Sequence, residues 1–208
     1  MNIMVIKNHL YLSLVSLLAS YLFFSGLVFA QELIVLNERG KPTRDVLELL
    51  GDMKSGDFGR SIYAVNDASA FHSELVNGPT DGTKARLIDF TGDSCVTPDN
   101  CFSLLFYKSY HGYLDLSRYS ALVFDVKVET FPSRPIGIRI GSYPTRAEID
   151  ITDRLPLAGE GWKTIQLTLK EFNDNLYENF SSVYTEDVFS IGTTGKARLL
   201  LANIRWVE

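Results

Sequence analysis

The chain has 208 residues, of which 46% are hydrophobic and 22% are charged, a balance that excludes a disordered, collagen-like or coiled-coil protein. The formal net charge is −5, from 20 Lys and Arg against 25 Asp and Glu, without any basic cluster, so nucleic acid is not an expected partner. The aromatic fraction of 12%, together with 15 Gly and 7 Pro scattered as turn residues would be, favours an all-β protein.

The first 30 residues have the pattern of a secretory signal peptide. Lys7 supplies the positive start, residues 10–29 are uncharged and mostly apolar, and Val28-Phe29-Ala30 offers a cleavage site before Gln31. An uncleaved membrane anchor is the alternative, because such an apolar run is long enough to span a bilayer. Cleavage would leave residues 31–208 as one periplasmic or secreted domain that does not touch the membrane.

The N-terminal part of this mature chain carries short patterns. Residues 33–36 are expected to form an apolar strand that stops at Asn37. The best helical candidate is 43–53, although its leucines are too clustered to distinguish a short helix from an irregular packed segment. Two more strands are expected at 61–65 and 84–91. Each follows an expected loop, at 51–61 and at 77–83.

Cys95 and Cys101 both lie in the exported part, with a Pro-Asp turn between them. An oxidising compartment favours a disulfide between them, and so short a loop would contribute about 2–3 kcal/mol at most. These cysteines with His72 and His111 cannot build a standard zinc site, and no CxxC, HExxH or EF-hand pattern occurs. We therefore expect no cofactor, and for a structural calcium ion, which jelly rolls often hold, no ligand set can be named.

The second half of the chain alternates apolar and polar residues with the period of a β-strand. Residues 121–128 place four apolar side chains on one face and Asp125 with Lys127 on the other. The same pattern recurs at 136–140 and 165–169, and residues 197–207 are expected to form a last long strand. Because turn signals separate these strands and no long helix intervenes, the sequence predicts an all-β fold, a jelly-roll β-sandwich that fills the mature chain.

No motif for catalysis stands out. Hydrolysis of sugars needs two carboxyl groups about 5–10 Å apart, and Glu148 and Asp150 would share one face of a strand, but a solvated sheet face explains that pair without chemistry. The sequence has no Gly-x-Ser-x-Gly elbow and no phosphate-binding glycine loop, and a triad built on His72 or His111 would be arbitrary. We therefore do not expect an enzyme.

A polar sheet face is the better candidate for a site. Asp125, Lys127, Arg139 and Gln166 lie opposite the apolar sides of their strands, which would gather them on one surface. Charged groups hydrogen-bond sugar hydroxyls and aromatic rings stack on sugar C–H faces, so Tyr143, at a strand end, is a candidate stacking platform. An ordinary exposed face with local salt bridges, and a structural role for the tyrosine, are the alternatives.

Other aromatic residues fall at the ends of the expected strands. Trp162 follows a Gly-Glu-Gly turn and is interpreted as core or rim packing, and Trp206 alternates with Ile204 and is expected to be buried. Four more aromatic residues are expected in a loop that either contacts a ligand or covers the edge of the core: Tyr107, Tyr110, His111 and Tyr113.

A series of short motifs follows in a characteristic order from Leu114 to Val207. They are Asp115-Leu116-Ser117, 121–128, Pro132-Ser133-Arg134-Pro135, Gly141-Ser142-Tyr143-Pro144, Ile149-Asp150-Ile151-Thr152, Gly161-Trp162, Phe172, Phe180-Ser181-Ser182-Val183 and 202–207. In this order and spacing the chain resembles the galactose-binding-like domain at the C-terminus of ExoP-type exo-1,3/1,4-β-glucanases, which are family-three glycoside hydrolases. The resemblance implies a free-standing β-sandwich of the carbohydrate-binding-module type. It also implies no activity, because the hydrolytic residues of those enzymes lie in separate catalytic domains.

The sequence departs from the family pattern at several positions. Ser142, Thr145 and Glu171 stand where the pattern has cysteines, so that bridge is missing. Thr83-Lys84 replaces an acidic pair, and Phe90 replaces a tryptophan. Any ligand or domain contact that those groups make in the family is therefore in doubt here.

Two classes of function follow. The first is an exported, non-catalytic module that binds β-glucan-like or related saccharides through the polar face described above. The second is an interaction or accessory module that docks on a glycoside hydrolase or an envelope protein. A polar groove flanked by aromatic rings would favour the first, and an exposed apolar patch would favour the second. An unrecognised hydrolase would require two carboxyl groups in a pocket.

Overall fold

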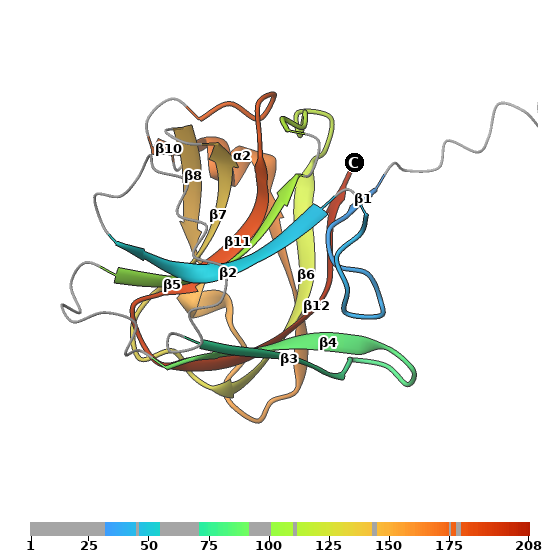
Figure 1. Ribbon diagram of the computed structural model, residues 1–208, viewed down its shortest axis with the longest axis vertical. Helices are drawn as coiled ribbons and strands as arrows, with labels where there is room; N and C mark the ends of the chain where they lie inside the picture. Colours follow the sequence, from blue (N-terminus) through green and yellow to red (C-terminus); the bar gives the residue numbers. More distant parts are fainter. Residues whose placement is uncertain are drawn as a thin grey trace, which may run out of the picture. The chain divides into compact units, whose positions relative to one another are not determined.

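Two antiparallel β-sheets pack face to face around one hydrophobic core (Figure 1). The computed structural model describes residues 32–44, 46–54, 71–91, 101–109, 112–142, 145–174, 176–177 and 180–208. The predicted all-β sandwich of the jelly-roll, galactose-binding-like type is confirmed.

Each sheet has six strands. Sheet 1 has the order β3 (Phe71–Asn77), β4 (Lys84–Phe90), β12 (Ala197–Val207), β6 (Ala121–Thr130) and β9 (Trp162–Thr168), with β1 (Leu33–Ile34) also paired to β12. Sheet 2 has the order β10 (Leu176–Tyr177), β8 (Thr145–Asp150), β7 (Ile136–Ser142), β11 (Asp187–Thr193), β5 (Cys101–Ser109) and β2 (Val46–Lys54). Two short helices, η2 (Thr152–Arg154) and α2 (Leu169–Asp174), flank β9 along the chain.

The alternating segments form strands where the sequence predicts them. In β6, Leu122, Phe124 and Val126 are fully buried, whereas Asp125 and Lys127 on the other face are partly exposed. The strands expected at 84–91, 136–140 and 197–207 are β4, β7 and β12. Period-two patterning was sufficient for these strands because each has one face against the core.

The expected strand at 165–169 ends one residue early, at Thr168, where α2 begins. The backbone N–H of Glu171 donates to the Thr168 hydroxyl (3.2 Å), and the backbone N–H of Thr168 donates to Glu171 Oε2 (2.7 Å). This reciprocal pair is a capping box, which satisfies two backbone donors at the start of a helix. Arg154 adds a bond from Nη2 to Glu171 Oε1 (2.6 Å) and so ties η2 to α2.

The helical candidate at 43–53 was wrong. Val46–Lys54 is strand β2, which pairs with β5 from Val46 opposite Ser109 to Lys54 opposite Cys101. The clustered leucines do not form the apolar stripe of an amphipathic helix. The strand that supplies the backbone hydrogen bonds of β2 is some 50 residues away in sequence, so no local pattern reveals the pairing.

Strands β3, β5, β10 and β11 were not predicted, and β8 was expected only through the spacing of Glu148 and Asp150. In β11 the alternation is broken by a register shift between Asp187 and Phe189, which turns both Val188 and Phe189 into the core. Tyr107 lies in β5 rather than in the expected aromatic loop, and Tyr113 lies in the segment that follows β5. Strands with bulges or with apolar residues on both faces lack the pattern on which sequence reasoning depends.

Trp206 connects the two sheets. It is fully buried, as predicted, and packs near Phe172 and Tyr119, with ring centroids 6.0 Å and 6.5 Å away. Its indole N–H donates to the backbone oxygen of Val188 (2.9 Å), so a side chain of sheet 1 hydrogen-bonds the backbone of sheet 2. This bond satisfies the one polar atom of the indole inside the core.

Several expectations fall on residues outside the described ones. They are the signal peptide at 1–30, the strand at 61–65, Cys95 of the expected disulfide, Tyr110, His111 and Tyr143. Cys101 begins β5. Among the described residues, no helix has the length and apolar character needed to cross a membrane.

The two tryptophans are expected to differ in their contribution to stability. Trp206→Ala should lower the free energy of unfolding by about 3–5 kcal/mol, because it leaves a large cavity and an unpaired carbonyl between the sheets. Trp162→Ala should cost no more than about half as much, because Trp162 is only partly buried. Urea unfolding followed by circular dichroism measures both, and equal losses would contradict this account of the core.

Glu171 should make stability depend on acidic pH. Burial raises the pKa of its carboxyl, but hydrogen bonds from the Thr168 backbone, Arg154 and the Thr168 hydroxyl outweigh burial and lower the pKa below the ordinary glutamate value. The stabilisation is therefore complete at neutral pH and is lost as the pH falls below about 4.5. Glu171→Gln should cost about 1 kcal/mol at neutral pH and progressively less in acid. A difference from the unmutated protein that does not change with pH would contradict the role of the ionised carboxylate.

Candidate functional site

The outer face of sheet 2 carries mostly glycine and serine on its neighbouring strands β7 and β11. On β7, Gly137, Arg139 and Gly141 alternate with three core isoleucines and therefore point away from the core. On the neighbouring strand β11, Gly192 lies opposite Gly137 and Ser190 lies opposite Arg139. Arg139 therefore has only glycine and serine as its outward-facing neighbours on β7 and β11.

Arg139 is held by a two-point contact with Glu148, the residue directly opposite on β8. Its Nε lies 2.7 Å from Oε2 and its Nη2 lies 3.1 Å from Oε1. The Arg139 side chain is 8% exposed, whereas that of Glu148 is 28% exposed. A fork-shaped pair of this kind fixes both side chains in one geometry, and the carboxylate is the partner that solvent reaches more easily.

Gly137 makes room for this ion pair. A Cβ atom at position 137 would lie 2.5 Å from Glu148 Oε1 and 3.2 Å from both Cδ and Cγ of the same side chain. The carboxylate of Glu148 therefore lies directly over the backbone of Gly137. Any larger residue there would push Glu148 away from Arg139.

An open hollow of about 350 Å³ adjoins this centre at the start of β7. It is lined by Pro132, Ser133, Arg134, Pro135, Asp150, Thr152 and Asp153. Asp150 is opposite Gly137 in the sheet and accepts bonds from the backbone N–H (2.8 Å) and the hydroxyl (2.6 Å) of Thr152. Because Ala147 and Ile149 point into the core, Glu148 and Asp150 share the outer face of β8, as the sequence predicts.

We call the set of Gly137, Arg139, Gly141, Glu148, Ser190 and Gly192 the Arg139 face. The sequence placed only Arg139 in a site. Glu148 was assigned to a solvated face, and the roles of Ser190 and Gly192 were missed. The signal that was available is the segment 136–141, in which glycines alternate with isoleucines on the side away from the core.

The expectation that four polar residues share one surface was wrong. Arg139 belongs to sheet 2, whereas Asp125, Lys127 and Gln166 lie on β6 and β9 of sheet 1. The chain passes from one sheet to the other between β6 and β7, so the polar sides of these consecutive strands face opposite sides of the sandwich. Tyr143 follows β7 but lies outside the described residues.

Asp125 has a structural role on sheet 1. Its Oδ1 accepts a bond from the Thr164 hydroxyl and its Oδ2 accepts one from Asn203 Nδ2, each at 2.6 Å. Asn203 has a φ of 52° and lies where the register of β12 against β6 shifts between Ala202 and Arg205. Asp125 thus stabilises a bulge in β12, after which Ile204 and Trp206 point into the core.

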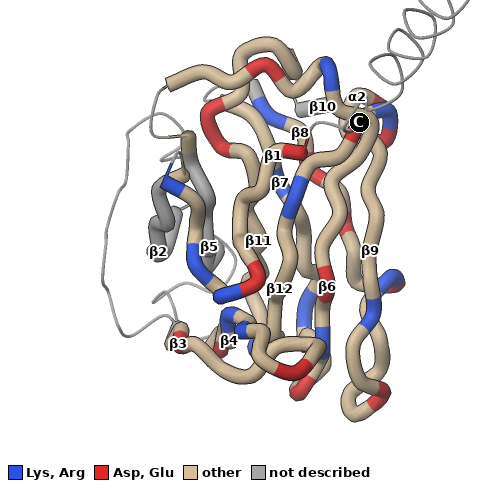
Figure 2. Tube along the Cα trace, turned by 90° about the vertical axis from the view of Figure 1, so that its right-hand side faces the viewer, with Lys and Arg blue, Asp and Glu red and all other residues tan. Residues whose placement is uncertain are grey.

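The rest of the outer face of sheet 1 is occupied by contacts within the sheet. Trp162 and Val76 pack on a small second cluster of buried residues, Ala85, Leu87, Leu200 and Ala202, which agrees with the interpretation of Trp162 as a packing residue. In the register of the sheet, Lys127 lies beside Trp162 and Leu200, and Gln166 lies beside Val123. Basic and acidic residues are spread along β12, β6 and β9 in Figure 2.

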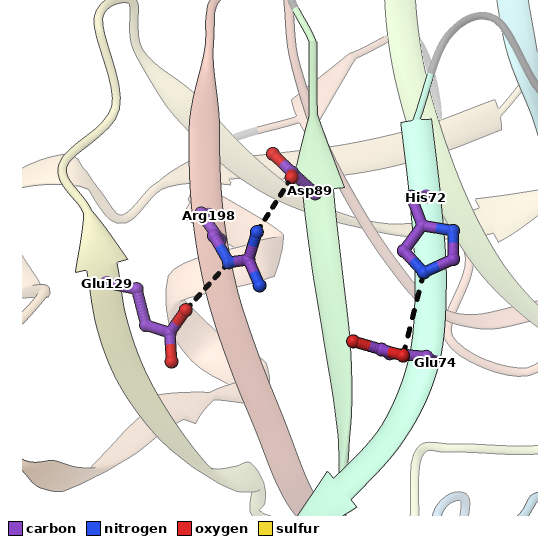
Figure 3. A network of polar contacts seen from close by, with 5 residues as sticks. All are labelled: His72, Glu74, Asp89, Glu129 and Arg198. Atoms are coloured by element: carbon purple, nitrogen blue, oxygen red, sulfur yellow. Dashed lines mark hydrogen bonds and ion pairs between the residues drawn. The ribbon is translucent and has the colours of Figure 1, made fainter.

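Charged residues toward one end of this face pair with one another (Figure 3). Arg198 on β12 lies between Glu129 on β6 and Asp89 on β4, with N–O distances of 2.7 Å and 3.1 Å. His72 and Glu74 on β3 are 3.7 Å apart. In the part of the chain that the structure describes, no group of three or more His, Cys, Asp or Glu side chains is arranged to hold a metal ion.

Comparison with known proteins agrees with the motifs and with the fold. Residues 105–206 match the family Exop_C, which is described as galactose-binding domain-like. This part of the chain, just under half of it, is similar to the Exop_C galactose-binding-like domain. The resemblance to the C-terminal domain of ExoP-type glucanases is thereby confirmed, while no curated protein matches the sequence.

Solved structures extend the similarity over most of the chain. A family 30 carbohydrate-binding module of a Clostridium thermocellum cellulosomal cellulase matches with a TM-score of 0.59 and 12% identity, over 85% of this chain and 96% of the other. A family 11 module from Clostridium thermocellum, in complex with a β-1,3-1,4-mixed-linked tetrasaccharide, matches with 0.53 and 13%, over 85% and 95%. The extra C-terminal domain of the exo-1,3/1,4-β-glucanase ExoP from a Pseudoalteromonas species matches with 0.56 and 11%, over 82% and 89%. Most of the chain therefore has the β-sandwich fold of these carbohydrate-binding modules.

The dependence of the ion pair on Gly137 can be measured with a double-mutant cycle. Gly137→Ala should lower the free energy of unfolding by about 1–3 kcal/mol, because the new methyl group displaces Glu148 from Arg139. In a Glu148→Ala background the same change should cost close to nothing, since no carboxylate remains to be displaced. Urea unfolding of the unmutated protein, the two single mutants and the double mutant measures these free energies. If Gly137→Ala lowers the free energy of unfolding equally in both backgrounds, its effect does not come from displacing Glu148.

Proposed function

We propose that this domain is an exported, non-catalytic module that binds a β-glucan-like or related saccharide on the Arg139 face of sheet 2. The observation that carries the proposal is the Arg139–Glu148 pair, held in fixed geometry among glycine and serine and next to an open hollow. Export is inferred from the signal-peptide pattern at 1–30.

The chemistry of this face suits a polyhydroxylated ligand. A sugar hydroxyl is both a donor and an acceptor, so it can donate to the Glu148 carboxylate, which Arg139 holds in one orientation. Because the adjoining hollow is open and the Arg139 side chain is largely buried, little of a ligand would be enclosed, and we expect weak binding.

The two acidic groups at the site support binding rather than hydrolysis. A glycosidase needs one carboxyl group as a proton donor and a second as a base or nucleophile. Here Glu148 is engaged at both oxygens by Arg139, and Asp150 accepts two hydrogen bonds from Thr152. Each carboxylate thus serves as a fixed acceptor in the sheet and its adjoining turn.

One comparison guides the choice of ligand, and another supports a second candidate function. The family 11 module was solved with a β-1,3-1,4-mixed-linked tetrasaccharide, which makes mixed-linkage β-glucan the first saccharide to test. The ExoP match is an extra domain of a glucanase, so a module of this fold can also belong to a hydrolase. An accessory module that docks on a glycoside hydrolase or an envelope protein is therefore the second candidate.

The proposal predicts where substitutions weaken binding. With residues 31–208, Arg139→Ala should weaken binding of mixed-linkage β-glucan oligosaccharides about tenfold, because it frees Glu148 from its fixed position. Glu148→Gln, which keeps the shape but not the charge, should weaken it less. Isothermal titration calorimetry measures each, after a glycan array has chosen the ligand.

Lys127→Ala is the matched control, since it removes a cation from the outer face of sheet 1. It should leave affinity within about twofold. A loss with Lys127→Ala but not with Arg139→Ala would move the site to sheet 1. A correctly folded protein that binds no glycan on the array would favour the accessory role.

A further inference from the structure

Two tyrosines are exposed to solvent as a pair at one end of the sandwich. Tyr113 is 61% exposed and Tyr184 is 62% exposed. Their ring centroids are 5.9 Å apart, and the ring planes meet at 87°, an edge-to-face arrangement. The edge of one ring rests on the other, so most of the surface of both rings stays open to solvent.

The backbone holds this pair rigidly. The segments that carry the two rings exchange bonds in both directions between Leu114 and Thr185, with N–O distances of 2.8 Å and 3.0 Å. The N–H of Leu116 donates to Ser182 O (2.7 Å), and Thr185, between Tyr184 and Glu186, is fully buried. Large apolar rings fixed in an exposed position lose little conformational entropy on binding, which favours affinity.

The pair is connected directly to the strand that carries Arg139. The hydroxyl of Ser142, the last residue of β7, donates to the backbone oxygen of Tyr184 (2.8 Å). The N–H of Glu186 donates to the Ser142 hydroxyl (2.8 Å) and to Gly141 O (3.1 Å). Ser142 follows Arg139 by three residues, or about 10 Å of extended chain. The segment around 181–186 thus continues from the end of β7, at the same end of the sandwich as α2 (Figure 1).

The size of the exposed surface indicates a small flat ligand. A tyrosine can bury about 150–250 Å², so the open parts of the two rings together offer roughly 200–300 Å². A specific protein interface needs about 800 Å² from each partner. A single sugar ring, with one apolar C–H face and hydroxyls at its edge, matches both the area and the mixed character of tyrosine.

We infer that Tyr113 and Tyr184 form a stacking subsite for one pyranose ring of a saccharide chain that also contacts the Arg139 face. This inference rests on the proposed function and adds to it a second contact, beyond the end of β7. The Arg139 face supplies directional hydrogen bonds, and the tyrosine pair supplies apolar contact for the next part of the chain. A ligand that reaches both must be an oligosaccharide rather than a single sugar.

Affinity for oligosaccharides of different length tests the subsite. With a β-1,3-1,4-linked tetrasaccharide, Tyr113→Ala and Tyr184→Ala should each weaken binding about five- to tenfold. Tyr184→Phe, which keeps the ring, should remain within about twofold. The alanine variants should bind a disaccharide as the unmutated protein does, because a short ligand occupies only the Arg139 face.

Leu157→Ala is the matched control, because Leu157 is also 62% exposed but is not an aromatic residue. Leu157→Ala should leave the affinity for the tetrasaccharide unchanged. If the unmutated protein binds the tetrasaccharide and both tyrosine-to-alanine variants bind it equally well, the subsite is refuted and the proposed function stands. If the unmutated protein binds no saccharide, the proposed function fails and the subsite fails with it.

Discussion

The burial of one face of each sheet against the other is the constraint on which the rest of this structure depends. Trp206 and Phe124 from sheet 1 meet Val188 and Phe189 from sheet 2, through the indole hydrogen bond and an edge-to-face contact with centroids 5.6 Å apart. Because successive side chains of a strand point to opposite sides, filling the core determines which residues are left for the two outer faces. Function can reside only in what those outer faces and their connecting loops present.

The two outer faces differ in how their polar groups are used. On sheet 1, Asp125 holds the bulge at Asn203, and Arg198 bridges Glu129 and Asp89, so the charges mainly stabilise the sheet itself. On sheet 2, the Arg139–Glu148 ion pair lies among glycines, beside a hollow and within one strand length of an exposed tyrosine pair. A ligand that needs both directional hydrogen bonds and a flat apolar contact finds them along sheet 2.

Sequence reasoning succeeded where a residue's environment followed from its own strand. Trp206 was correctly expected in the core, and Glu148 and Asp150 were correctly expected on one face of a strand. It failed where a distant partner decided the outcome. The leucines of 46–50 became a strand through pairing with β5, and Val188 escaped the pattern because a bulge turned it inward next to Phe189. For the same reason, Arg139 was wrongly expected on one surface with Asp125, Lys127 and Gln166, which lie on the other sheet.

By itself, the sequence determined the fold class, the strands β4, β6, β7 and β12, and the family resemblance, because alternation and turn chemistry are local properties of the chain. Only the tertiary structure decided which sheet each strand joins, and therefore that Arg139 and Asp125 face opposite sides of the molecule. It also brought Arg139 to Glu148 and Tyr113 to Tyr184. Such contacts depend on which strands pair and in which register, and the paired segments are far apart in sequence. The alternation within one strand shows which side chains share a face, but it does not show which strand lies beside it.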